Sequence, residues 1–281
     1  MRSEQDMTAA GPAAPRRRRL RWLRAPLGFV LLLLLLLMGP LAVVASGTVE
    51  IGSRWRMASR DSTGQAPDPA VERGAVVQVY GARTVDWRGA FGIHCWVAVK
   101  RSDAPHYTLY QVLGWRAYRG GRAIDVREGA VPDGRWFGQY PQLLAERRGQ
   151  GVEELIDRIE AAVADYPWPD RYRVWPGPNS NTFVAHIGRQ IPELRLDLPP
   201  TAIGKDFLGP SVFVASTPSG TGWQVSAYGL LGASVAWEEG IELNLLGLSV
   251  GLDVNDLALR LPGIGSLGLT GAAGRAPASR G

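Results

Sequence analysis

The stretch AFGIHCWVAVK, residues 90–100, decides how the chain is interpreted. Its β-branched and aromatic residues, bounded by turn-forming positions, predict a β-strand. Similar runs occur at residues 76–80 (VVQVY), 106–115 (HYTLYQVLGW) and 123–128 (AIDVRE). Only short segments connect them, and short connections join antiparallel neighbours. The sequence therefore predicts an antiparallel meander.

The period of the apolar residues changes after the meander. Residues 151–166 have apolar side chains three and four positions apart, which predicts an amphipathic helix. A second helix is expected from Asn179 onward, with Asn179 as its N-cap, and residues 172–175 (YRVW) predict a short strand. The expected fold class is α+β, with an antiparallel sheet packed against two main helices.

The N-terminal part predicts a membrane segment. An arginine block, RRRRLRWLR at residues 16–24, precedes a stretch without charge that ends at Glu50. About 20 apolar residues span a bilayer as a helix, and the positive-inside rule keeps the arginine block cytoplasmic. We therefore predict a basic tail over residues 1–25, a single transmembrane helix over residues 26–47 and an exported remainder.

A cleavable signal peptide is the alternative for this segment. Gly39 and Pro40 are expected to break the helix, and Val43-Val44-Ala45 resembles a cleavage site. Both interpretations place the rest of the chain outside the cytoplasm.

The remainder divides into a polar linker, a domain and a tail. The linker covers residues 48–74, the exported domain residues 75–270 and a disordered tail residues 271–281. Within the domain, residues 211–262 are apolar, rich in glycine and nearly without charge. They predict a β region of bulged, curved strands.

Composition excludes several classes of function. Seven of the 31 basic residues but only two of the 26 acidic residues precede residue 50, so the remainder of the chain is neutral. A neutral body argues against nucleic acid as a partner, because phosphate contacts need a basic face. The chain has one cysteine, three histidines and no nucleotide-binding glycine motif. We expect no metal and no cofactor.

Two features together suggest chemistry. His94 lies on a predicted strand, and Ser180 lies at the start of a predicted helix, where free N–H groups stabilise negative charge. A nucleophile there and a histidine from a packed sheet can perform acyl transfer. His94 would be the general base, Ser180 the nucleophile and Gln111, near His94 in the paired strand, the orienting group. The oxyanion would be bound at the helix start, formed by Asn179, Asn181 and Thr182.

Structural roles remain open for each of these residues. His94 could be an ordinary core histidine, Ser180 a capping residue and Gln111 an edge-strand amide. We expect Cys95 to face away from His94, because neighbouring side chains of a strand point to opposite faces. His106 is expected to be exposed and His186 to be structural.

The positions of His94 and of NSNTFV, residues 179–184, resemble the circularly permuted papain-like superfamily, which includes NlpC-type hydrolases and lecithin:retinol acyltransferase-like enzymes. There a histidine on an early strand serves a cysteine in an Asn-Cys-x-x-Phe-Val segment that opens a helix. The resemblance implies a permuted papain-like core and the roles given above for His94 and Ser180. The chain departs from the pattern because serine replaces the nucleophilic cysteine, and serine needs a base to take its proton.

A second resemblance covers about residues 75–270. The tracts HCWVAVK, GWR, WPGPNSNTF and LPPTAIGKD, behind one membrane helix, are similar to a bacterial family of unknown function. This implies a single-pass protein of the bacterial inner membrane with its C-terminal domain outside the cytoplasm.

Three functions stay open. The first is a hydrolase or acyltransferase that acts on amides or esters of the cell envelope. The second is an inactive papain-like module that binds an envelope peptide or lipid. The third is a structural protein whose glycine-rich region contacts the membrane or partners.

Overall fold

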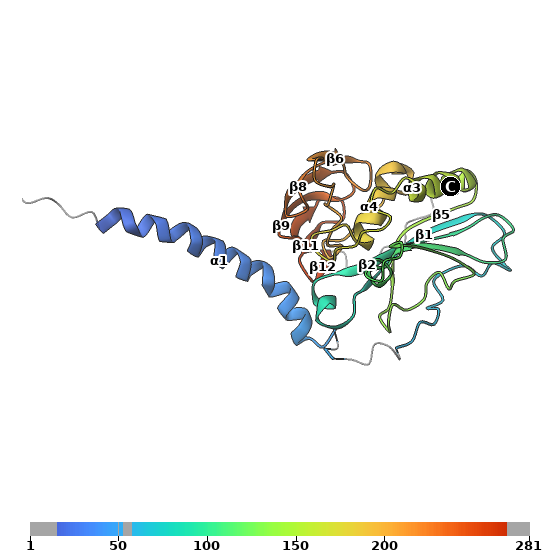
Figure 1. Cartoon of the computed structure of the whole chain (residues 1–281), viewed down its shortest axis with the longest axis horizontal. Coiled ribbons are helices and arrows are strands. Elements are labelled where there is room, and N and C mark those ends of the chain that lie inside the picture. The colour runs from blue at the N-terminus through green and yellow to red at the C-terminus, as the bar shows by residue number, and fades with distance from the viewer. Residues whose placement is uncertain (1–15, 50, 53–57, 269–281) are drawn as a thin grey trace, which may run out of the picture.

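The computed structural model describes residues 16–49, 51–52 and 58–268, and the side chains from residue 24 onward. The predicted tail at 271–281, and most of the one at 1–25, lie outside the described residues. A long helix, α1 (Arg16–Ala45), leads to a body with two antiparallel sheets and few further helices (Figure 1).

Helix α1 is long and apolar enough to cross a membrane between Arg24 and Ala45, with a mean hydropathy of 2.8. The expected break at Gly39 and Pro40 is wrong, because the helix continues through both residues. Proline is tolerated in such helices where neighbouring groups compensate for the lost hydrogen bond. Here the turn at residues 262–264 packs against this part of α1, and a Cβ atom on Gly39 would lie 2.0 Å from the Pro262 carbonyl oxygen.

The first sheet has the order β4-β3-β2-β1-β5, and every neighbouring pair is antiparallel. Its strands are β1 (Val76–Arg83), β2 (Ile93–Lys100), β3 (Thr108–Val112), β4 (Ile124–Glu128) and β5 (Gln142–Arg148). The predicted meander of four strands is confirmed. The fifth strand pairs with the free edge of β1, and its polar sequence QLLAERR gave no strand signal.

Two helices cover one face of this sheet. They are α3 (Val152–Ala164) and α4 (Ser180–Gln190), as predicted, and they contact each other as well as the strands. Their buried side chains, such as Ile159 and Phe183, share a core with Val97 of β2. Short helices complete this part: η2 (Asp86–Ala90), α2 (Gly114–Ala117) and η3 (Pro192–Leu194).

The strand expected at residues 172–175 is wrong. The backbone N–H of Arg173 donates to the Pro178 carbonyl, and the indole of Trp175 donates to the Leu246 carbonyl. The segment pairs with no strand because these local contacts and the turn at 176–178 shape its path.

The opposite face of the first sheet has its own aromatic core, formed by residues such as Tyr80, Trp96 and Tyr107. Irregular chain from residues 59–70 lies over it and is held by Asp133, which accepts hydrogen bonds from the side chain of Ser62 and the backbone N–H of Gln65. Burial alone would raise the pKa of Asp133, but these hydrogen bonds lower it.

The second sheet is a meander of seven strands in sequential order. Its strands are β6 (Val214–Ser216), β7 (Gly222–Ala227), β8 (Leu231–Ala236), β9 (Gly240–Leu245), β10 (Leu248–Asp253), β11 (Ala258–Leu261) and β12 (Gly265–Gly268). The predicted β region is confirmed. The sequence predicts single strands over residues 223–237 and 241–252, but each of these stretches forms a hairpin. At Leu246 and Gly247 both φ angles are positive (56° and 82°), the geometry of a two-residue type I′ turn.

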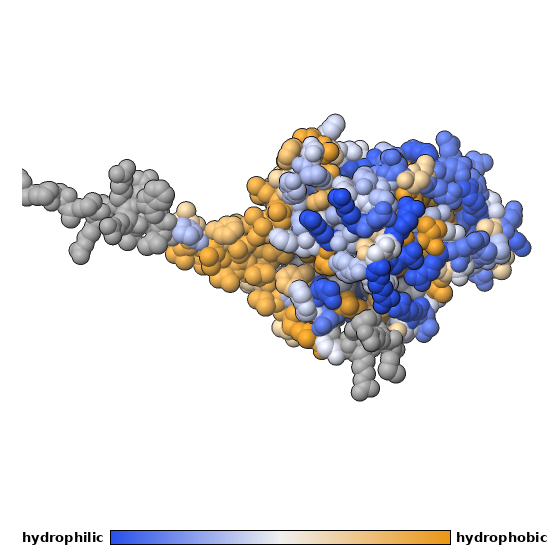
Figure 2. Space-filling view, viewed as in Figure 1, coloured by the Kyte–Doolittle hydropathy of each residue, from blue (hydrophilic) through white to orange (hydrophobic). Residues whose placement is uncertain are grey.

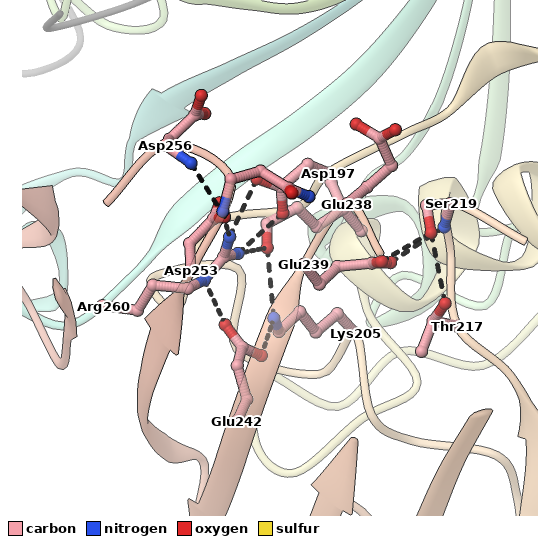
Figure 3. A network of polar contacts seen from close by, with 12 residues as sticks. Asp197, Lys205, Thr217, Ser219, Glu238, Glu239, Glu242, Asp253, Asp256 and Arg260 are labelled. Atoms are coloured by element: carbon pink, nitrogen blue, oxygen red, sulfur yellow. Dashed lines mark hydrogen bonds and ion pairs between the residues drawn. The ribbon is translucent and has the colours of Figure 1, made fainter. Parts of the chain in front are cut away.

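Buried charges join the second sheet to the segment after η3 (Figure 3). Arg260 of β11 donates to Glu242 of β9 at 2.6 Å and makes two hydrogen bonds of 2.7 and 2.8 Å to Asp197. Lys205 pairs with the other oxygen of Glu242. Burial alone would lower the pKa of Arg260, but the two carboxylates raise it. The network therefore fixes which face of the sheet meets the body.

Candidate functional site

His94 lies near the start of β2, on the sheet face that carries Trp96. This face is opposite to α3 and α4, whereas Cys95 points into the core beneath the helices. The expected separation of Cys95 from His94 is thus confirmed. Only 4% of the surface of His94 is exposed, and burial lowers the pKa of its imidazole to about 4. The ring is therefore neutral at pH 7 and able to accept a proton.

A chain of polar side chains orients His94. Its Nε2 atom lies 3.0 Å from the Gln111 Oε1 atom, and the Gln111 amide nitrogen donates to Asp125 at 2.9 Å. Two arginines, Arg116 and Arg127, contact the Asp125 carboxylate at 2.8 and 2.9 Å. The Gln111 carbonyl oxygen must accept from His94, so Nε2 carries the proton and Nδ1 is the basic atom.

The link from His94 to Gln111 was anticipated, but its extension to Asp125 was not. Gln111 and Asp125 are register partners of β3 and β4, and alternation along β4 could have suggested the carboxylate. The arginines come from a short helix and from β4 itself, so their convergence depends on the tertiary fold.

An aromatic wall covers the imidazole. The ring of Trp136 stacks on His94, with 3.7 Å between centroids and 12° between planes. Trp115 in turn stacks on Trp136, with 6.0 Å between the ring centroids, and Phe137 meets Trp136 edge-on. Tryptophans such as Trp136 suggest a core or a cleft wall in the sequence, but the stacking on His94 could not be predicted, because Trp136 lies in an irregular segment whose path is set by Asp133.

Ser180 is the first residue of α4 and is buried. Ser180 lies beside the hydroxyl of Tyr172; burial raises the pKa of that hydroxyl to about 12, and Ser180 acts in the opposite direction. The Tyr172 ring packs closely against Gly114, the residue that follows β3 and Leu113. Ser180 therefore lies at the same end of the first sheet as the end of β3.

Asn179 caps α4 as predicted. Its Oδ1 atom accepts from the backbone N–H groups of Asn181 and Thr182 at 2.9 and 3.1 Å, and the Thr182 hydroxyl accepts from the Asn179 N–H. These bonds form a capping box. They occupy the N–H groups that the sequence suggested for an oxyanion. In the described part of the chain the Ser180 N–H donates to no other group, so this donor remains.

Asn181 brings the start of α4 to β2. Its amide nitrogen donates to the carbonyl of Ile93, the residue before His94, at 3.0 Å, while its Oδ1 atom is buried without a hydrogen-bond partner. The start of α4 therefore packs against the strand that carries His94, which the acyl-transfer layout requires. Among the described hydrogen bonds, none joins His94 to Ser180, and the His94 ring lies on the sheet face away from α4.

The other histidines have local partners. His106 is half exposed and pairs with Glu128 at 2.8 Å, as expected for an exposed position. His186 hydrogen-bonds to the Ala162 carbonyl of α3 at 3.1 Å, which is a structural contact between helices. Within the described ranges, no cluster of three or more His, Cys, Asp or Glu side chains could hold a metal ion.

Comparison with known proteins gives one result. Residues 74–207 match the model of a family whose description is "Protein of unknown function (DUF3750)". The match covers the first sheet, both helices of the body and the segment through Lys205, and it ends before the second sheet. No curated protein and no solved structure matches the chain. The resemblance to a family of unknown function is supported over this range, while the papain-like relationship stays a prediction.

Proposed function

We propose that the body is a membrane-anchored, exported domain that hydrolyses or transfers acyl groups on amides or esters of the cell envelope. The observation that carries the proposal is the oriented, neutral imidazole of His94, held through Gln111 by Asp125. A base with one nitrogen fixed by a hydrogen bond and the other free is the arrangement that nucleophilic catalysis uses.

The reaction would require the His94 ring, which lies on the face away from α4, and the Ser180 side chain to meet around the end of the sheet where β2 begins. There the Ser180 hydroxyl would give its proton to Nδ1 of His94 as its oxygen attacks the acyl carbon. The Ser180 N–H would stabilise the oxyanion, and the free oxygen of Asn181 could hold a substrate N–H. His94 would then protonate the leaving amine or alcohol. Water, or an acceptor hydroxyl or amine, would take the acyl group from Ser180 by the reverse sequence.

The anchor is preferred over a cleaved signal because α1 packs on the body. Leu36 and Val43 are buried, and Val43 shares a small core with Ala90 and Ile264. Cleavage after Ala45 would remove these contacts. With the arginine block inside, the body lies outside the cytoplasm, in the bacterial case at the outer face of the inner membrane.

A specific observation favours a second candidate, an envelope-binding module without catalysis. The Asn179 side chain is already bonded within the fold, and the His94 ring faces away from α4, which carries Ser180. Trp115, Trp136 and Phe137 form an aromatic wall of the kind that binds ligands by stacking. Such a module would bind a peptide or lipid of the envelope and leave it unchanged.

The test is hydrolysis of p-nitrophenyl acyl esters by the full chain in detergent. Ser180→Ala should reduce kcat/KM by about 10³-fold or more and His94→Gln by about 10²-fold. Ser226→Ala is the matched control, since Ser226 and Ser180 are equally buried (3% exposed). Ser180→Cys should remain active, because a thiol loses its proton more readily. Equal rates of ester hydrolysis in the Ser180→Ala and unmodified chains would contradict the catalytic proposal and favour the binding module.

A further inference from the structure

The second sheet has an apolar outer face. One row of cross-strand partners crosses six strands, and its side chains are 45–69% exposed: Trp223, Val235, Ile241, Leu252, Leu259 and Leu267. The parallel row is also apolar: Val214, Val225, Ala233, Leu243 and Val250. We call these two rows the outer face. Among its strand positions between residues 214 and 268, none carries an ionisable side chain.

The inner face of the same sheet is polar. The row between the two apolar ones contains Gln224, Ser234, Glu242, Gly251 and Arg260 as successive partners. A sheet with one face in water normally buries its apolar side and exposes its polar side. Here the polarity is reversed, and the ion pairs of Glu242 and Arg260 lock that orientation (Figure 3).

The outer face is continuous with helix α1. The turn at residues 262–264, between β11 and β12, packs against Gly39 and Pro40. Ile264 also joins the core that contains Val43. Figure 1 shows the second sheet on the flank of the body toward α1, and Figure 2 shows hydrophobic surface extending from α1 onto that flank.

The contact with α1 sets the depth of this flank. From Arg24 to Ala45 the helix is about 31 Å long, close to the ~30 Å of the hydrocarbon core. Gly39 lies six residues before Ala45, so the turn at residues 262–264 is about 9 Å below the end of the span. Amphipathic elements insert ~5–10 Å into a leaflet, and this turn reaches the same depth.

We infer that the outer face lies in the acyl-chain boundary of the leaflet from which the body emerges, so that the lipid bilayer covers it. The inference rests on the proposed anchoring by α1. The exposed indoles of Trp223 and Trp237 suit the membrane interface, where tryptophan is enriched. Lipid is favoured over a second copy of the chain because α1, whose side chains are mostly exposed, adjoins the same flank.

The test measures contact between labels and lipid chains in the full chain. Single cysteines carrying the fluorophore NBD are placed at Val235→Cys and Leu243→Cys on the outer face. Val126→Cys on β4 is the matched control, since Val126 is 53% and Val235 62% exposed. Leu31→Cys in α1 reports the anchoring. The unmodified chain, with Cys95 buried, gives the labelling background. The protein is reconstituted into phosphatidylethanolamine–phosphatidylglycerol vesicles with phosphatidylcholine bearing a nitroxide on its acyl chain.

We expect the labels at 31, 235 and 243 to lose about half or more of their emission, because nitroxides quench only at contact distances within the leaflet, and the label at 126 to lose little. A quenched label at 31 with unquenched labels at 235 and 243 would overturn the inference and leave the anchoring intact. Outer-face labels that are protected from water only at a high protein-to-lipid ratio would indicate that a second copy of the chain covers the face. That result would also overturn the inference and leave the anchoring intact. An unquenched label at 31 would refute the anchoring and the inference with it.

Discussion

Protonation of His94 should destabilise the folded chain. In the fold, burial lowers the pKa of the imidazole to about 4, whereas an unfolded histidine titrates near 6.5. Between these values the unfolded chain binds more protons, so the free energy of unfolding must fall as the pH falls from 6.5 to 4 and must level off below it. A shift of about 2.5 pKa units corresponds to about 3 kcal/mol.

The perturbation that isolates this effect is His94→Gln, because glutamine cannot take up a proton yet can bond to Gln111. Thermal unfolding of the detergent-solubilised full chain is measured at pH 7 and pH 4 for both proteins. Other groups also titrate in this range, including Glu239, whose pKa burial raises. Their contribution is common to both proteins and cancels in the difference between the two pH effects.

We expect the unmodified chain to lose about 6–12 °C more in Tm than the His94→Gln chain between pH 7 and pH 4, from about 2–4 °C per kcal/mol in a protein of this size. The variant itself should be less stable at pH 7, since it loses the stacking on Trp136. Equal pH effects in the two proteins would refute the conclusion that the imidazole is buried and neutral.

Three further variants test other parts of the structure. Arg260→Met removes the buried partner of Asp197 and leaves Glu242 with Lys205 alone, so it should cost about 3–5 kcal/mol, seen as a large drop in Tm. Arg148→Met, at an exposed pair, should cost ~1 kcal/mol or less. Asn179→Ala removes the cap of α4 and should cost about 1–2 kcal/mol by the same measurement. Asp125→Asn removes the charge that raises the His94 pKa, so an NMR titration should give a still lower imidazole pKa in that variant; an unchanged value would contradict the link.

Much of the fold could be predicted because local patterns agree with it. The apolar spacing of α3, the Asn179 cap and the β-branched runs of the first sheet each specify one element. Strand β5 was missed because its side chains are mostly polar, and the segment at 172–175 was mistaken because its β-propensity is overridden by contacts with residues such as Gly114 and Leu246.

The candidate site was predicted only in part for a similar reason. Gln111 could be predicted, because side chains alternate between the two faces of paired strands and this places Gln111 near His94. Asp125, Trp136 and Tyr172 reach the site through tertiary packing. The reversed polarity of the second sheet was also hidden, because alternation shows two faces without telling which one is buried. Lys205 and Arg260 decide it, and they are 55 residues apart in the chain.

Reaction with a fluorophosphonate, followed by mass spectrometry of the peptides, tests whether His94 activates Ser180 as a nucleophile. We predict an adduct on Ser180, no adduct on this peptide in Ser180→Ala and at least ~10-fold slower labelling in His94→Gln, because the base is lost. No adduct on Ser180, or labelling at the same rate without His94, would contradict it.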